Sequence, residues 1–273
     1  MKKITLVSLN HYCKLVLRSM LFLIAIYLYV TRWHGNPDAP FGHETDSLFL
    51  MIVWVLGAAE ILSRFFPSRL ESMGCQKVFA QNYTPTGVDT TNFKLDTWKS
   101  TFVVAVVWLA LNGLFGWLYW NGIVDTGFMF LLCLFYSVCD MICILFFCPF
   151  QSWFMKNRCC TTCRIYNWDF PMMWTPMIFV GGWYGLSLLG LALVLLARWE
   201  YVVHKYPERF SIETNACLNC LHCPEKLCFH KKQLIGLWLI HNQLMLVLRT
   251  FHIAIRSISS YVLTAATLCI KCQ

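Results

Sequence analysis

The chain has 273 residues, of which 58% are hydrophobic and only 13% are charged. Ordinary soluble domains carry about a quarter charged residues, so this composition excludes a soluble globular fold. The formal net charge is +8, but no basic cluster is interleaved with stacking aromatic residues, and we therefore expect no nucleic-acid partner. The composition predicts an all-α, multi-pass helical transmembrane bundle whose main partner is the lipid bilayer.

Apolar stretches long enough to cross a bilayer recur along the chain, since a spanning helix needs about twenty apolar residues. The sequence predicts about five spans, over residues 15–30, 48–66, 101–120, 128–147 and 171–197. In the first span, Arg18 is expected to extend to the membrane surface near the helix end. In the second, Glu60 and Arg64 are four residues apart and are expected to pair on one helix face.

The third and fourth spans are joined by a short turn, NGIVDTG (121–127), which predicts an antiparallel hairpin. Asp140 is the one carboxylate of the fourth span, and a carboxylate inside a membrane indicates either a functional site or a helix–helix hydrogen bond. Asp169 precedes the fifth span and is typical of a helix start. The glycines of 181–185 predict close helix packing.

Two further regions follow the transmembrane domain, which we place at residues 1–197. Residues 198–232 form a charged, cysteine-rich extension, and residues 233–273 form an amphipathic tail. On a helical projection of the tail, the basic and polar side chains fall on one side, which favours a helix lying at the membrane interface. Those side chains are His241, Asn242, Arg249, His252 and Arg256.

Eight of the fifteen cysteines fall into two short segments. They are Cys148, Cys159, Cys160 and Cys163 in the first, and Cys217, Cys220, Cys223 and Cys228 in the second. Thiolates at C-x-x-C spacing reach a common metal centre. The second run resembles the cluster-binding run of bacterial ferredoxins, but it is one residue longer before its last cysteine and has Pro224 after the third. Both segments therefore predict a metal site, with zinc or an iron–sulfur cluster as the cofactor.

Other interpretations of the cysteines stay open. Cys133, Cys139 and Cys143 lie in the apolar fourth span, where cysteine behaves as a small hydrophobic residue. Disulfides are the alternative to metal if the first segment faces an oxidising compartment.

The distribution of Lys and Arg predicts a cytoplasmic N-terminus. Four lie at the N-terminal end (2, 3, 14, 18), five in the loop 64–99 (64, 69, 77, 94, 99) and three in the loop 149–170 (156, 158, 164), whereas the two intervening loops hold only Arg32. If 171–197 crosses the bilayer completely, the second cysteine segment lies outside, although six Lys and Arg residues between 198 and 232 favour the inside. A re-entrant segment, broken near Pro176 and Gly181, is the alternative that would place both cysteine segments on one face.

Three functions are compatible with these features. The first is a membrane-embedded metal or redox protein, with an electron-transfer or protein partner. The second is a scaffold whose loops are held by metal or disulfides, and the third is a small transporter or channel. No nucleophile and base can be placed together, so a conventional enzyme is least supported. Several spans with cysteine-rich edges resemble bacterial membrane proteins of unassigned activity, which implies the bacterial inner membrane as the location.

Overall fold

The computed structural model describes residues 6–36, 39–42, 44–67, 78–90, 93, 95, 98–155 and 163–219. The chain divides into two compact units, Met1–Cys228 and Phe229–Gln273, and every described residue belongs to the first. The predicted tail at 233–273 therefore lies outside the described residues, as do five of the eight candidate metal ligands, Cys159, Cys160, Cys220, Cys223 and Cys228.

Five helices of the described chain are long and apolar enough to cross a bilayer. They are α1 (Leu6–Leu28), which continues as the π-helical turn η1 (Tyr29–Trp33), α2 (Glu44–Ser63), α4 (Trp98–Trp120), α5 (Thr126–Leu145) and α8 (Gly182–Lys205). No strand is present among the residues described. The predicted all-α fold with about five spanning helices is confirmed at this level.

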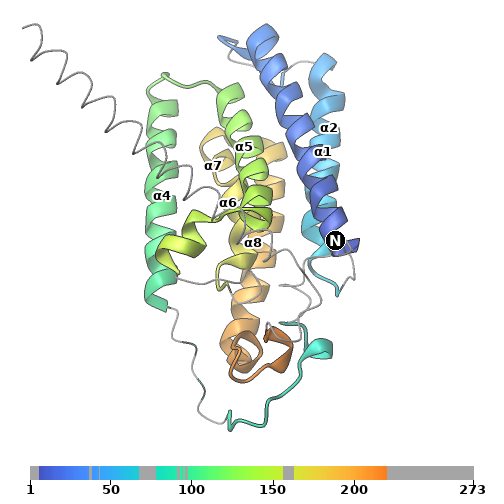
Figure 1. The fold of residues 1–273 in the computed structure, drawn as a ribbon. Helices are drawn as coiled ribbons and strands as arrows, with labels where there is room; N and C mark the ends of the chain where they lie inside the picture. The colour runs from blue at the N-terminus through green and yellow to red at the C-terminus, as the bar shows by residue number, and fades with distance from the viewer. Residues whose placement is uncertain are drawn as a thin grey trace, which may run out of the picture. The chain divides into compact units, whose positions relative to one another are not determined.

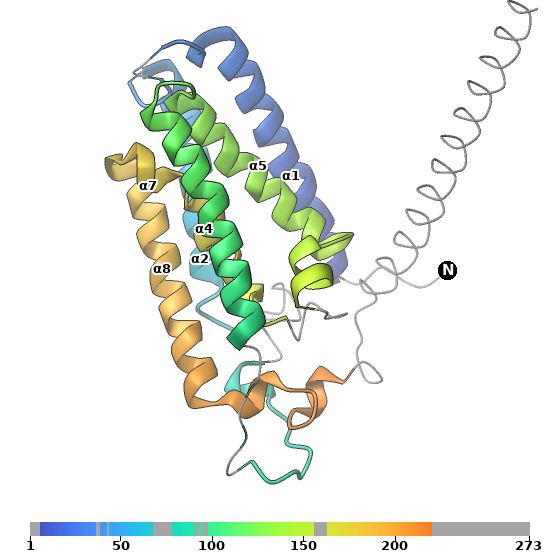
Figure 2. The same cartoon turned by 90° about the vertical axis from the view of Figure 1, so that its left-hand side faces the viewer.

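The long helices lie side by side, as Figures 1 and 2 show. Helix α1 packs along α5, and α2 packs against α8. Helices α4 and α5 form the predicted antiparallel hairpin, in which Asp125 caps α5 by accepting a hydrogen bond from the Phe128 backbone N–H at 2.7 Å. The core includes Phe130, Leu188 and Leu195.

Helix α4 illustrates why these helices suit a lipid environment. Its buried residues are Thr101, Val104, Trp108, Asn112 and Gly116, which follow one another at the three- and four-residue spacing of a single helix face. The remaining faces expose large apolar side chains, including Val103, Val106, Leu109, Leu114 and Trp117. A soluble monomer rarely exposes a continuous apolar surface of this extent, whereas a bilayer covers one.

The stretch expected to form one span at 171–197 has a different structure. It begins with two short helices, α6 (Asp169–Trp174) and α7 (Met177–Val180), and the continuous helix α8 starts only at Gly182. Pro176 separates the short helices, and Gly181 and Gly182 both have a positive φ, of 72° and 78°, a backbone conformation that glycine adopts without a steric penalty.

The short helices run antiparallel to α8. Trp168, just before α6, donates a hydrogen bond from Nε1 to Glu200 near the end of α8 at 2.8 Å, whereas Met177 packs on Gly185 near its start. A Cβ atom at Gly185 would lie only 2.6 Å from Met177 Cβ, so this glycine permits the close approach. The chain thus reverses at Gly181–Gly182, as the re-entrant alternative requires, and the helix of spanning length in this region is α8.

Candidate functional site

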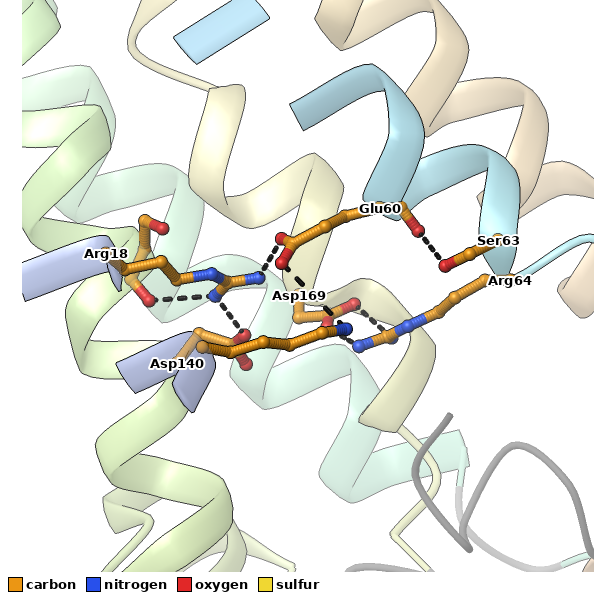
Figure 3. A network of polar contacts seen from close by, with 8 residues as sticks. Arg18, Glu60, Ser63, Arg64, Asp140 and Asp169 are labelled. Atoms are coloured by element: carbon orange, nitrogen blue, oxygen red, sulfur yellow. Dashed lines mark hydrogen bonds and ion pairs between the residues drawn. The ribbon is translucent and has the colours of Figure 1, made fainter. Parts of the chain in front are cut away.

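The guanidinium of Arg18 lies at the centre of a buried polar network (Figure 3). It donates to Glu60 Oε2 on α2 at 2.5 Å, to Asp140 Oδ2 on α5 at 2.9 Å and to the Ser137 carbonyl at 2.9 Å. The Arg18 side chain is only 6% exposed. The prediction that it extends to the membrane surface was therefore wrong, because two carboxylates from neighbouring helices hold it inside the bundle.

A second guanidinium, that of Arg64, lies just after the end of α2 and is bound by Asp169 at the start of α6 (Figure 3). The two pairs of atoms are 2.8 Å and 2.6 Å apart. The guanidinium also lies 4.6 Å from the centroid of the Phe170 ring, a favourable cation–π geometry. Asp169 starts a helix as predicted, but the expected pairing of Glu60 with Arg64 is replaced by Glu60–Arg18 and Arg64–Asp169.

These two groups form one layer of charge near one end of the bundle. Lys14 joins it with its Nζ atom 3.8 Å from Glu60 Oε1, so three cations face three carboxylates. At a rise of 1.5 Å per residue, Glu60 and Asp140 lie about 5 Å and 8 Å inside the ends of α2 and α5. Buried charges are tolerated when each has a partner, and here the partners come from four helices, α1, α2, α5 and α6.

A pocket of about 130 Å³ borders this layer. Asp140 and Asp169 both line it, and between them lie six sulfur-bearing side chains: Cys139, Cys143, Cys148, Cys163, Met172 and Met173. Trp108, Tyr136 and Phe150 close it with aromatic rings. The pocket is therefore a largely apolar space in which the polarisable atoms are sulfurs.

The structure brings some predicted metal ligands together and leaves others apart. Cys148 and Cys163 line the same pocket, whereas Cys217 lies elsewhere, with its Sγ atom 3.2 Å from Thr84 Oγ1. Within the described ranges, no three His, Cys, Asp or Glu side chains are grouped as a metal site, and none of the described cysteines forms a disulfide. The metal-binding prediction is thus without structural support from this part of the chain.

Two pocket cysteines were missed by the sequence interpretation. Cys139 and Cys143 were treated as small hydrophobic residues, an interpretation that fits the fully buried Cys133. The signal that could have found them is spacing: they are four residues apart on one helix and flank Asp140, so the three side chains lie near the same stretch of α5.

The described cysteines of the two segments, Cys148, Cys163 and Cys217, lie toward the same end of the bundle. Arg164, one residue after Cys163, makes a two-pronged ion pair with Glu200 near the end of α8. Beyond α8, the segment leading to Cys217 pairs with the loop after α2, through an isolated bridge between Pro85 and Asn215. This end also holds most of the described basic residues: Lys14, Arg18, Arg64, Lys99, Arg164, Arg198, Lys205 and Arg209.

At the opposite end, aromatic residues and one arginine hold the carboxylates. Asp46 is almost fully buried, and it accepts a hydrogen bond from the Trp33 indole Nε1 at 2.7 Å and one from Arg32 at 3.1 Å. Tyr29 donates from its hydroxyl to Asp125 at 3.3 Å. Arg32 is the one Lys or Arg among the described residues of the loops at this end.

Comparison with known proteins adds no further constraint: no protein-family model matches the chain, and no curated protein or solved structure is detectably similar to it.

Proposed function

We propose that this chain is an integral membrane protein with a metal site on its cytoplasmic face. The cysteine-rich segments bind the metal, which is either zinc or an iron–sulfur cluster. The observation that carries the proposal is the reversal at Gly181–Gly182. Because α6 and α7 run back along α8, the chain on both sides of this stretch returns to one end of the bundle. Both cysteine segments then belong to one compartment.

The charge distribution supports the orientation. Cytoplasmic loops carry an excess of Lys and Arg, and the reversal removes the conflict that a single crossing at 171–197 creates. Arg198, Lys205 and Arg209 now share an end with the basic N-terminal and 64–99 segments. We therefore assign this end to the cytoplasm, where reducing conditions keep thiols available for metal rather than for disulfides.

The best ligand set remains Cys217, Cys220, Cys223 and Cys228. Two-residue spacings allow successive sulfurs to reach one centre, and three or four such ligands close a structural site. Asn215 supports the start of this run, since its side chain accepts a hydrogen bond from the Cys217 backbone N–H at 3.1 Å and donates one to the Arg209 carbonyl at 2.9 Å. A metal here would tie the extension to the end of α8.

The test is the metal content and visible spectrum of the full chain, purified anaerobically in detergent. The Cys220→Ser, Cys223→Ser double variant is compared with a Cys13→Ser, Cys133→Ser control, which removes the same number of thiols elsewhere. Stoichiometric iron with colour, lost in the first variant alone, establishes a redox centre. Stoichiometric colourless zinc, lost in the same way, establishes a structural site. Absence of metal from the wild-type protein overturns the proposal.

The broken helix favours a second candidate, a small transporter. Transporters form binding sites at interrupted helices, and the break between α6 and α7 adjoins the layer that contains Asp140 and Asp169. Ion flux into proteoliposomes that stops in Asp140→Asn, but persists in Arg32→Gln at the opposite end, would support transport. Equal flux in protein-free vesicles would exclude it.

A further inference from the structure

The sulfur atoms of the pocket come from separate parts of the chain. Cys139 and Cys143 lie on α5, Cys148 lies in the turn after α5, and Cys163 precedes the helical turn η5 (Tyr166–Trp168). Met172 and Met173 add two thioethers from α6. Their assembly therefore depends on the fold, and in particular on the position of α6 that the Arg64–Asp169 ion pair secures.

Within this group, Cys143 and Cys148 form a pair of interacting thiols. Helix α5 ends at Leu145, and the backbone N–H groups of Phe146 and Phe147 both donate to the Ile142 carbonyl, at 2.8 Å and 3.1 Å. This tight end turns the chain, so that the Cys148 thiol reaches the Cys143 thiol by a hydrogen bond. Cys148 Sγ also accepts a hydrogen bond from the Gln151 backbone N–H at 3.4 Å, which fixes its position.

The oxygen ligands that border the pocket are already engaged. Asp140 is bound by Arg18 and Asp169 by Arg64, so a hard cation such as Mg²⁺ or Ca²⁺, which prefers oxygen ligands, would have to displace a guanidinium. Thiolates and thioethers, in contrast, select soft ions. The chemistry of the pocket therefore favours a soft metal ion over a hard one.

The number of ligands separates the soft ions from one another. Zinc takes four ligands in structural sites, and no group of three His, Cys, Asp or Glu side chains is assembled in the described parts of the chain. A soft monovalent ion, by contrast, is satisfied by two thiolates in a linear arrangement. The hydrogen-bonded pair Cys143 and Cys148 supplies two such sulfurs next to the thioethers of Met172 and Met173.

We propose that Cys143 and Cys148 bind a soft monovalent metal ion, of the class of Cu(I) and Ag(I), in this pocket. Binding forms two metal–sulfur bonds and releases the two thiol protons, and no atom changes its oxidation state. This site is separate from the one proposed for Cys217–Cys228. It does not depend on that proposal, and it assigns Cys148 to the pocket instead of to a four-cysteine set with Cys159, Cys160 and Cys163.

The experiment titrates the full chain, reduced and anaerobic in detergent, with Ag(I) and with Cu(I) against a chromophoric competing chelator. The test variant is Cys143→Ser, Cys148→Ser, which keeps the size of both side chains and a hydrogen bond between them but removes both soft ligands. The matched control is Cys133→Ser, three turns earlier on α5, buried and outside the pocket. A third protein, Cys220→Ser, Cys223→Ser, reports on the cysteine-rich extension.

We expect one Ag(I) or Cu(I) site in the wild-type protein, in Cys133→Ser and in the extension variant. The variant Cys143→Ser, Cys148→Ser should lack this site. Affinity at that site should fall by more than roughly 100-fold, beyond what the loss of an outer-shell partner of a metal costs. X-ray absorption of the Cu(I)-loaded extension variant should show sulfur neighbours only.

Two outcomes overturn this inference. One is unchanged binding in Cys143→Ser, Cys148→Ser. The other is an equal loss in Cys133→Ser, which would reflect damage to the helix instead of a lost ligand. If the extension variant binds as much metal as the wild-type protein, the result counts against the proposed function and leaves this inference intact. Gel-filtration profiles confirm that each variant stays folded, and the single variant Cys143→Ser provides the same test should the double variant aggregate.

Discussion

The two ends of the helix bundle hold their buried carboxylates by different means. At the basic end, Glu60, Asp140 and Asp169 are bound by guanidinium groups that project inward from the helices. At the opposite end, Asp46 is held by the Trp33 indole and by Arg32, whose side chain is 52% exposed. Among the described residues, ion pairs between two largely buried side chains therefore lie at the basic end, which also holds the sulfur-lined pocket and the described cysteines Cys148, Cys163 and Cys217.

This difference favours the basic end as the place to look for function, because ionisable residues inside a membrane protein often mark functional sites. Internal ion pairs are costly to assemble and are weak evidence of stability alone, because desolvation offsets much of their attraction. At the opposite end, the neutral indole of Trp33 and the half-exposed Arg32 hold Asp46, so no guanidinium has to be buried there. The following predictions test whether the two ends differ as described.

The largest expected difference between the two ends is the side of the membrane on which each of them lies. Alkaline phosphatase inserted at the 121–122 turn is expected to be active, because that turn lies at the end assigned to the outside, and a fluorescent protein inserted after residue 209 is expected to fluoresce in the cytoplasm. The exchanged pair of fusions should give no signal. Signals from both exchanged fusions would reverse the orientation.

Arg18→Met should give the largest loss of stability, about 3–5 kcal/mol, because it leaves Asp140 buried without its cation and leaves Glu60 with the more distant Lys14. The matched change at the other end, Arg32→Met, should cost about 1 kcal/mol or less, since the Arg32 side chain is half exposed and the buried Asp46 keeps its hydrogen bond from Trp33. Reversible denaturation by SDS in mixed micelles measures both. Similar losses for the two variants would show that the ends do not differ.

Trp33→Phe should lower the free energy of unfolding by about 1.5–3 kcal/mol. An aromatic ring remains, but it is smaller than the buried indole and cannot donate to Asp46, and hydrogen bonds to charged groups contribute in this range. Trp120→Phe, at a ring that is largely exposed, serves as the control in the same denaturation assay. A Trp33 variant as stable as this control would mean that Arg32 and water satisfy Asp46.

Gly185→Ala should cost about 1–3 kcal/mol through overpacking against Met177. The control is Gly190→Ala on the same helix, where an added Cβ has no atom within 4 Å and should be neutral or slightly stabilising. Thermal melts in detergent distinguish them. Equal melting temperatures would show that α7 moves freely away from α8.

The sequence predicted the long helices well because length and hydropathy alone determine them. The span expected at 101–120 is observed as Trp98–Trp120, and that at 128–147 as Thr126–Leu145. The break at 171–197 was weighed as the less favoured alternative, because an uncharged stretch containing Pro176 and two glycines has the same hydropathy whether it crosses or turns back.

The charge network could be predicted only in part. Asp140 stood out because carboxylates are rare in spans, but its partner Arg18 is 122 residues away, and no local spacing connects them. The pairing of Glu60 with Arg64 followed the local rule for a helix face, yet tertiary contacts overrode it. The pocket as a whole was missed because Cys163, Met172 and Met173 join the cysteines of α5 only after α5 and α6 are packed.

The short helices α6 and α7 also constrain how the protein is made. With six and four residues, neither is long enough to enter a bilayer as an independent segment. The insertion machinery is therefore expected to integrate α5 and α8 first. Asp169 and the residues up to Gly181 would then dock between helices already in place, which makes the pairing of Arg64 with Asp169 a late step of biogenesis, and the sulfur-lined pocket would be completed only when that step is finished.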